Sequence, residues 1–175
     1  MKQTDTRTMA YINLFGVLGA LPSLCELSQE ARDIIAGKTI AIGIDVKGGP
    51  AGVLHFENGS MRVTEGCGKC DIKLPFGSPE KFNGMIDGTV TPIPSKGFLK
   101  LGFLLGPFIK LTDLLSKYLR PTEEDLKDEQ FFRTSTLLMF HVITGAVAQI
   151  GNEDKVGRAS ASYIVDGNVR MAITE

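Results

Sequence analysis

The dipeptide Asn58-Gly59 is the feature of this sequence that most constrains the fold. Residues 53–57 precede it and residues 61–64 follow it, and both segments have the apolar character of strands. Asn-Gly favours a type I′ turn, because both central positions of that turn need a positive φ. The sequence therefore predicts an antiparallel hairpin here. Residues 39–46 alternate apolar with smaller residues, so they predict a further strand.

The other expected elements are indicated by apolar spacing and by Gly and Pro. Apolar residues three or four positions apart indicate helices, and Pro at a first turn or Gly beyond a last turn marks their ends. The predicted helices are 9–36 (interrupted at Pro22 and capped again at Ser28), 79–88, 107–119 and 131–150. Further strands are predicted at 71–76 and 98–101, with a C-terminal hairpin of 159–165 and 169–173 around Asp166-Gly167.

Composition and charge exclude several classes of partner. The chain has 175 residues, of which 43% are hydrophobic, and this suits one ordinary domain with its own core. Nineteen Lys and Arg against 20 Asp and Glu give a net charge of −1. Nucleic acid and anionic membranes need a concentrated positive field, so we expect neither as the main partner.

The apolar run at residues 10–24 raises the question of a signal peptide or membrane span. It contains Asn13, lacks a small-residue cleavage site after it, and is short for a span of about 20 residues. Lys, Gly and Pro interrupt the second apolar stretch, 98–115. We therefore expect no stable membrane insertion. Three cysteines are too few for a disulfide framework, which favours a reducing, cytoplasmic location.

Cys67-Gly68-Lys69-Cys70 is the one motif that suggests chemistry. A metal site needs two further ligands, and none stands at paired spacing. A thioredoxin-like couple belongs at a helix start, whereas this one falls between predicted strands. An incidental turn is the favoured interpretation, and a redox role for Cys67 and Cys70 stays open. His55 and His141 are interpreted as structural, so we expect no metal, no cofactor and no enzymatic activity.

The order of elements in the middle of the chain resembles the sterol carrier protein 2 (SCP2) domain family. A strand pair around Asn58-Gly59 leads to a short strand at 71–74. There follow the pattern Phe82-x-x-x-Ile86-x-Gly88, a link containing proline, a strand through Leu99 and Leu101, and a closing helix to Leu119. The resemblance covers roughly residues 28–120.

The resemblance implies an α+β fold with a five-stranded, mostly antiparallel sheet covered by helices on one face. It further implies an apolar tunnel between the layers that takes fatty acids, acyl chains or sterols, and binding or transfer of lipid without chemistry. The whole chain, 1–175, is then one SCP2-like domain. Its core is 28–120, with an N-terminal helical extension at 1–27 and a helix plus hairpin at 121–175.

Segment 98–119 is the expected ligand-binding region. Fourteen of its 22 residues are apolar or aromatic, more than one covered helix face requires. Ordinary core packing is the alternative for these residues. The expected tunnel lining is Phe82, Ile86, Phe98, Leu101, Phe103, Leu104, Phe108, Leu111 and Leu115. A protein-interaction module, with helices 9–36 and 131–150 forming a homodimer or partner interface, is the alternative function.

Overall fold

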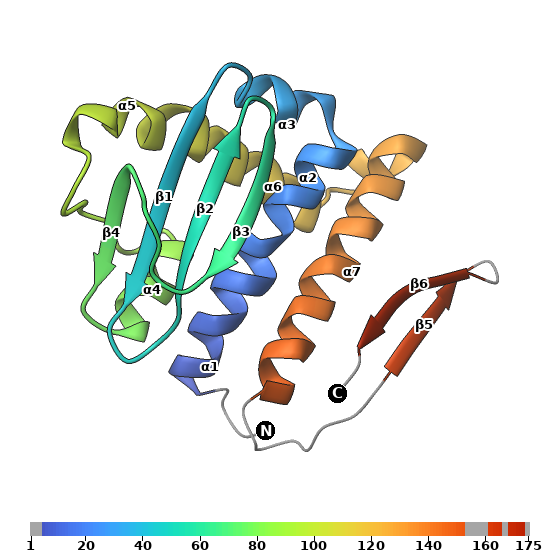
Figure 1. The fold of residues 1–175 in the computed structure, drawn as a ribbon. Helices are drawn as coiled ribbons and strands as arrows, with labels where there is room; N and C mark the ends of the chain where they lie inside the picture. The colour runs from blue at the N-terminus through green and yellow to red at the C-terminus, as the bar shows by residue number, and fades with distance from the viewer. Residues whose placement is uncertain (1–4, 153–160, 166–167, 174–175) are drawn as a thin grey trace.

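A four-stranded mixed sheet lies in front of a layer of helices in Figure 1. The computed structural model describes residues 5–152 and the backbone of residues 161–165 and 168–173. The strands are β1 (Thr39–Val46), β2 (Ala51–Glu57), β3 (Ser60–Glu65) and β4 (Ile72–Phe76), in the order β3-β2-β1-β4. β1 pairs with β2 and β2 with β3 in antiparallel fashion, and β4 pairs with β1 in parallel.

The hairpin predicted from Asn58-Gly59 is confirmed. Asn58 has φ 48° and Gly59 has φ 90°, the positive values that a type I′ turn requires. The register places Glu57 opposite Ser60 and Phe56 opposite Met61. Local turn chemistry therefore sets which face of β2 and β3 meets the helices.

The prediction of five mostly antiparallel strands is wrong, because residues 98–101 are helical. After Lys96, which forms a single bridge to Lys73 on the outer edge of β4, Gly97 takes φ 88° and turns the chain away from the sheet. A Cβ on Gly97 would clash with the carbonyl oxygen of Asp71, so the turn is packed directly against β4. The apolar residues after Gly97 continue into one helix, instead of pairing as a fifth strand.

The helices form three groups along the chain. The N-terminal rod consists of α1 (Thr6–Tyr11), a π-helical turn η1 (Ile12–Val17), a 3-10 turn η2 (Leu18–Ala20) and α2 (Leu21–Leu27), and α3 (Gln29–Ile34) follows it. The middle group is α4 (Pro79–Ile86) and then the continuous helix Phe98–Leu119, made of η3 (Phe98–Lys100), α5 (Leu101–Phe103), a π-helical turn η4 (Leu104–Phe108) and α6 (Ile109–Leu119). The last group is η5 (Asp125–Lys127) and α7 (Glu129–Asn152).

The predicted break in the first helix is confirmed at Ser28. Its side-chain oxygen accepts a hydrogen bond from the backbone N–H of Ala31 at 3.3 Å and caps α3. Leu14, Leu21 and Leu24 are fully buried, so the rod before Ser28 packs in the same core as the predicted domain at 28–120.

The core lies between the sheet and the helices. Every second residue of β1 points into it, namely Ile40, Ile42, Ile44 and Val46. On β2, the fully buried Phe56 contacts Phe103 and Phe108 edge to face, with ring centroids 4.9 Å and 6.3 Å away. At these positions, side chains fill the space between the two layers.

The opposite face of the sheet is crossed by residues 66–71, which lead from β3 at one edge to β4 beyond β1. A Cβ on Gly43 of β1 would lie 2.9 Å from Cys70 Sγ, and one on Gly68 would lie 3.3 Å from Val53. The crossing segment therefore sits directly on the strands, and the Cys67–Cys70 motif belongs to it.

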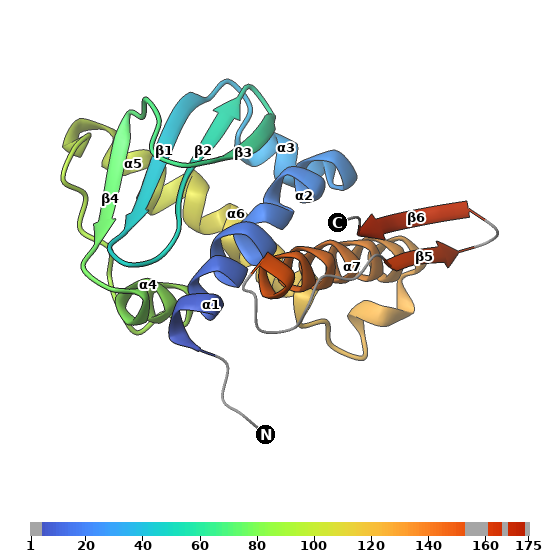
Figure 2. The same ribbon diagram turned by 60° about the horizontal axis from the view of Figure 1, so that its bottom comes forward.

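α7 lies beside the N-terminal rod (Figures 1 and 2), and the two helices touch at a pair of glycines. A Cβ on Gly145 would lie 2.7 Å from Gly16 Cα, and one on Gly16 would lie 3.3 Å from Val142 O. The two backbones are thus in direct contact: a side chain at Gly145 would force them apart, and one at Gly16 would need its neighbours to yield by a few tenths of an ångström. A hydrogen bond joins the rod to α4 as well: Asn13 Nδ2 donates to Asn83 Oδ1 at 3.0 Å.

The C-terminal strands are confirmed as a pair. β5 (Ala161–Val165) and β6 (Asn168–Ile173) are antiparallel, and the predicted turn at Asp166-Gly167 lies outside the described residues.

Among the residues that the structure describes, two helical segments are long and apolar enough to cross a membrane, judged by length and composition alone. They are Thr6–Leu27 and Glu129–Gly151, with mean hydropathy 1.4 and 1.3 in their most apolar stretches. In the first, 56% of that stretch is buried within the fold, and in the second 17%. The expectation of no stable membrane insertion stays a prediction.

Candidate functional site

An open depression of about 300 Å³ lies where the start of β1 meets the start of the Phe98–Leu119 helix. Its apolar part comes from Ile40, Leu99 and Phe103, and its polar part from Lys38, Thr39 and Lys100. The remaining lining residues are Gly37 and Gly102. The site therefore combines apolar side chains that continue into the core with two lysines at the surface.

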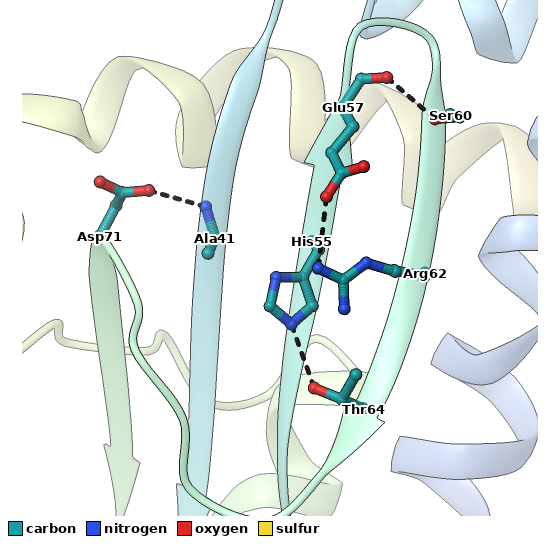
Figure 3. Close-up of polar contacts among 7 residues, drawn as sticks. All are labelled: Ala41, His55, Glu57, Ser60, Arg62, Thr64 and Asp71. Carbon is teal, nitrogen blue, oxygen red and sulfur yellow. Dashed lines mark hydrogen bonds and ion pairs between the residues drawn. The ribbon is translucent and has the colours of Figure 1, made fainter.

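Asp71 links the strands and the helix that border the depression. Its backbone N–H donates to the Ala41 carbonyl at 2.8 Å, and its Oδ2 accepts from the Ala41 N–H at 2.9 Å (Figure 3). Its Oδ1 lies 2.5 Å from Lys100 Nζ. The Lys100 hydrogen bond, followed by the Ala41 N–H, lowers the pKa of Asp71 below its usual value. One carboxylate thus ties β1 and the start of β4 to the helix that bears Leu99.

The nine predicted lining residues occupy three kinds of environment. Phe82, Phe103, Leu104, Phe108, Leu111 and Leu115 are buried, Ile86 and Leu101 are half-buried, and Phe98 is exposed. Phe103 is the member of the set that also lines the depression.

The structure divides this set between two places. Phe82 and Ile86 lie on α4, which packs against α1, and Phe82 contacts Phe76 at the end of β4 with ring centroids 5.2 Å apart. The other seven lie on the Phe98–Leu119 helix, whose first turns are at the opposite end of the sheet from α4 in Figure 1. The residues near Phe103 are therefore the part of the set that adjoins the depression.

A second open depression, of about 440 Å³, lies between α6, η5 and the start of α7. Charged and polar side chains dominate its lining, which is Lys117, Tyr118, Glu124, Asp125, Asp128, Gln130 and Phe131. None of the nine predicted residues is among them, so the first depression is the candidate site.

The cysteines are free thiols. Cys67 is exposed and Cys70 half-buried in the crossing segment, and within the described residues no group of three or more His, Cys, Asp or Glu is placed to hold a metal ion. Cys25 is buried, and desolvation raises its pKa to about 11 even though Arg32 opposes the shift. The redox interpretation of Cys67 and Cys70 stays a prediction.

The two histidines have different surroundings. His55 Nε2 lies 3.1 Å from Thr64 Oγ1 on the face of the sheet that carries the Arg62–Glu57 ion pair (Figure 3). Desolvation, followed by the charge of Arg62, lowers the pKa of His55. His55 is thus a hydrogen-bonded residue of the sheet, as predicted, whereas His141 is exposed on α7.

The polar residues of the candidate site were not among the predicted ones. Lys38, Lys100 and Asp71 are far apart in sequence, and no spacing rule connects them. Gly37 was predicted only as a helix end, whereas α3 ends earlier, at Ile34, and Gly37 takes φ 67° in the turn that follows. Their meeting depends on the parallel pairing of β4 with β1, which the sequence pattern did not indicate.

Comparison with known proteins gives similarity at the level of structure. No family model matches the chain, and no curated protein matches it. One similar solved structure is a conserved hypothetical protein from Thermus thermophilus described as a possible sterol carrier protein, with 15% identity and a TM-score of 0.40. The match covers 67% of this chain and 89% of that one.

A second similar structure is UbiJ-SCP2, a ubiquinone synthesis protein, with 18% identity and a TM-score of 0.33. The match covers 63% of this chain and 88% of the other. Both descriptions refer to sterol carrier proteins, the family that the order of elements in the sequence resembles.

Proposed function

We propose that this protein binds a lipid, without chemistry, by taking its acyl chain under the Phe98–Leu119 helix from the depression at the start of β1. The observation that supports this most is the continuity of the apolar surface. Phe103 lines the depression, contacts Phe56 in the core and is followed by the buried Leu104 and Phe108. Each CH₂ group buried along such a path contributes about 0.8 kcal/mol.

The ligand would enter by displacing side chains, because Phe56, Phe103 and Phe108 fill the interior here. The helix is weakest at this point: Leu104–Phe108 is a π-helical turn that contains Pro107. Proline has no N–H to donate, and π-turns depart from regular helical hydrogen bonding. The segment above the proposed path is therefore the one best able to move.

The head group would lie between Lys38 and Lys100, which are both exposed at the rim. Two ammonium groups favour a carboxylate or phosphate. Lys100 already pairs with Asp71, so Lys38 supplies the greater part of the uncompensated charge. The proposed ligand class is thus a fatty acid or another acyl lipid with an anionic head.

Replacing Gly102 by tryptophan tests this proposal. Gly102 lines the depression, and a Cβ there would meet no atom within 4 Å, so the ring would occupy the entrance without disturbing the core. We expect Gly102→Trp to weaken uptake of a dansyl-labelled fatty acid by about tenfold or more, equivalent to blocking roughly two buried CH₂ groups. The measurement is a fluorescence titration.

Ser116→Trp is the matched control. Ser116 lies further along the same helix, is exposed, and does not line the depression. We expect it to bind like the unmodified protein. Equal affinity of Gly102→Trp and the unmodified protein, or equal loss in both variants, would contradict the proposed entrance.

A second candidate function, an interaction module or homodimer, is favoured by the outer face of α7. Phe132, Phe140, Ile143 and Val147 are exposed large apolar side chains on this helix. Sedimentation equilibrium over a concentration series separates the two functions, because a lipid-binding monomer keeps its mass and a dimer does not.

A further inference from the structure

The outer face of the Phe98–Leu119 helix is apolar where a helix on the surface of a domain is normally polar. Phe98, Gly102, Leu105 and Ile109 follow one another at spacings of four, three and four, so they form a single stripe. All four are exposed, Leu105 to 70%. Leu99, beside this stripe, is fully exposed.

The same helix has a covered face, so the outer stripe is not its core contact. Phe103, Leu104, Phe108 and Leu111 are buried in the core, and the rings of Phe103 and Phe108 contact Phe56 of the sheet. Beyond Ile109 the outer face becomes polar, with Asp113 and Ser116 exposed. The exposed apolar surface is therefore confined to the first three turns, the part next to the depression.

The sequence that surrounds the stripe carries charge of one sign, and Asp71 adjoins it in space through Lys100. From Gly88 to Thr112 the chain contains Lys96, Lys100 and Lys110 and no Asp or Glu, although the whole protein carries a net charge of −1. All three lysines are exposed. Lys96 Nζ donates to the Cys70 carbonyl, and Lys100 pairs with Asp71, so both ammonium groups are held by the segment that leads into β4.

We infer that the stripe Phe98–Ile109, with Leu99, docks on an anionic lipid surface. Helices that lie in a membrane interface combine Leu and Phe on the buried side with lysines at its margin, and each lysine near an anionic surface strengthens the attraction. A protein partner would not need this one-sided charge. This inference rests on the proposed lipid-binding function, because docking through the stripe would place the entrance at Gly102 next to the membrane.

The docking surface and the entrance share residues. Leu99, Lys100 and Gly102 line the depression and also belong to the stripe or its basic margin. A lipid moving between membrane and protein would therefore travel only the length of these side chains before it reached Phe103.

Vesicle co-sedimentation of the full chain tests the inference. We expect binding to vesicles of phosphatidylcholine with phosphatidylglycerol, weaker binding to phosphatidylcholine alone, and loss of the difference at high salt. The double variant Leu105→Glu and Ile109→Glu should lower the partition coefficient on mixed vesicles by about tenfold or more, because it removes two inserting side chains and adds like charge. Both positions are exposed, so thermal unfolding should change little.

Ile143→Glu together with Val147→Glu on α7 is the matched control, with the same chemistry at two other exposed apolar positions. We expect this variant to bind vesicles like the unmodified protein. No vesicle binding by the unmodified protein, unchanged binding by the Leu105/Ile109 variant, or an equal loss in the α7 variant would overturn the inference.

A titration with dansyl-labelled fatty acid in the absence of vesicles separates this inference from the proposed function. Fatty acid uptake without vesicle binding rejects the docking surface alone. Vesicle binding that depends on Leu105 and Ile109, without uptake, rejects the proposed function and leaves the docking surface standing.

Discussion

Replacing Gly145 by leucine is expected to lower the free energy of unfolding by about 3 kcal/mol or more, the upper range for overpacking. The neighbour that a Cβ would meet at 2.7 Å is backbone, Gly16 Cα, and a second backbone atom, Phe15 O, lies at 3.1 Å. Backbone cannot rotate away as a side chain can. α7 would have to move off the N-terminal rod, which is its main attachment. Urea denaturation followed by circular dichroism measures the loss.

Gly151→Ala is the control for this experiment. Gly151 lies near the end of the same helix, and a Cβ there would meet nothing within 4 Å. Alanine favours a helix over glycine by up to about 1 kcal/mol, so this variant should be as stable as the unmodified protein or slightly more stable. If Gly145→Leu were equally well tolerated, the close crossing of α7 and the rod would be wrong.

Replacing Phe56 by alanine is expected to cost about 3–5 kcal/mol, the usual loss for a buried aromatic residue. Phe56 is fully buried, and its ring packs edge to face against Phe103 and Phe108. The variant would leave a cavity directly beneath the π-turn at Leu104–Phe108. Under the proposed function that cavity lies on the ligand's path, so added fatty acid should restore part of the lost stability in the same urea titration.

Phe132→Ala on α7 serves as the comparison, because Phe132 is half exposed and its loss should change stability by no more than about 0.5 kcal/mol. A loss of less than about 1 kcal/mol for Phe56→Ala would mean that the ring is not a core contact. A loss of unfolding free energy of the expected size that added fatty acid does not reduce would confirm Phe56 as a core contact. It would also contradict the proposed ligand path.

The predictable parts of this fold are those decided by neighbouring residues. Asn58-Gly59 can take positive φ cheaply, so its turn and the pairing of β2 with β3 follow from the sequence. Ser28 caps α3, as its chemistry predicts. The alternation through Ile40, Ile42 and Ile44 likewise identifies the buried face of β1.

The run Phe98–Leu101 was mispredicted because four residues, three of them apolar, are too few to show a period of their own. Its helical character depends on the next three turns of the chain, where Leu104, Phe108 and Leu111 continue the spacing, and on the turn at Gly97. The close approach of Gly16 to Gly145 could not be predicted either. Glycine is unfavourable in the interior of a helix, so the neighbouring sequence explains neither Gly16 nor Gly145. The close packing of two helices that are distant in sequence explains both.

The candidate site was predictable only in its apolar half. The abundance of apolar residues in 98–119 correctly indicates that this helix has more such surface than its covered face needs, and Phe98, Leu105 and Ile109 are indeed exposed. The ion pair of Lys100 with Asp71 and the approach of Lys38 arise from tertiary structure. The nine residues expected to line one tunnel lie in two places, because α4 packs against α1 instead of extending the surface around Phe103.

Native mass spectrometry of the freshly purified protein, followed by solvent extraction and lipid analysis, tests the central claim most directly. The account predicts a complex with one lipid per chain, and an acyl chain with an anionic head in the extract. A protein that carries no lipid and takes up no dansyl-labelled fatty acid would contradict the lipid-binding function.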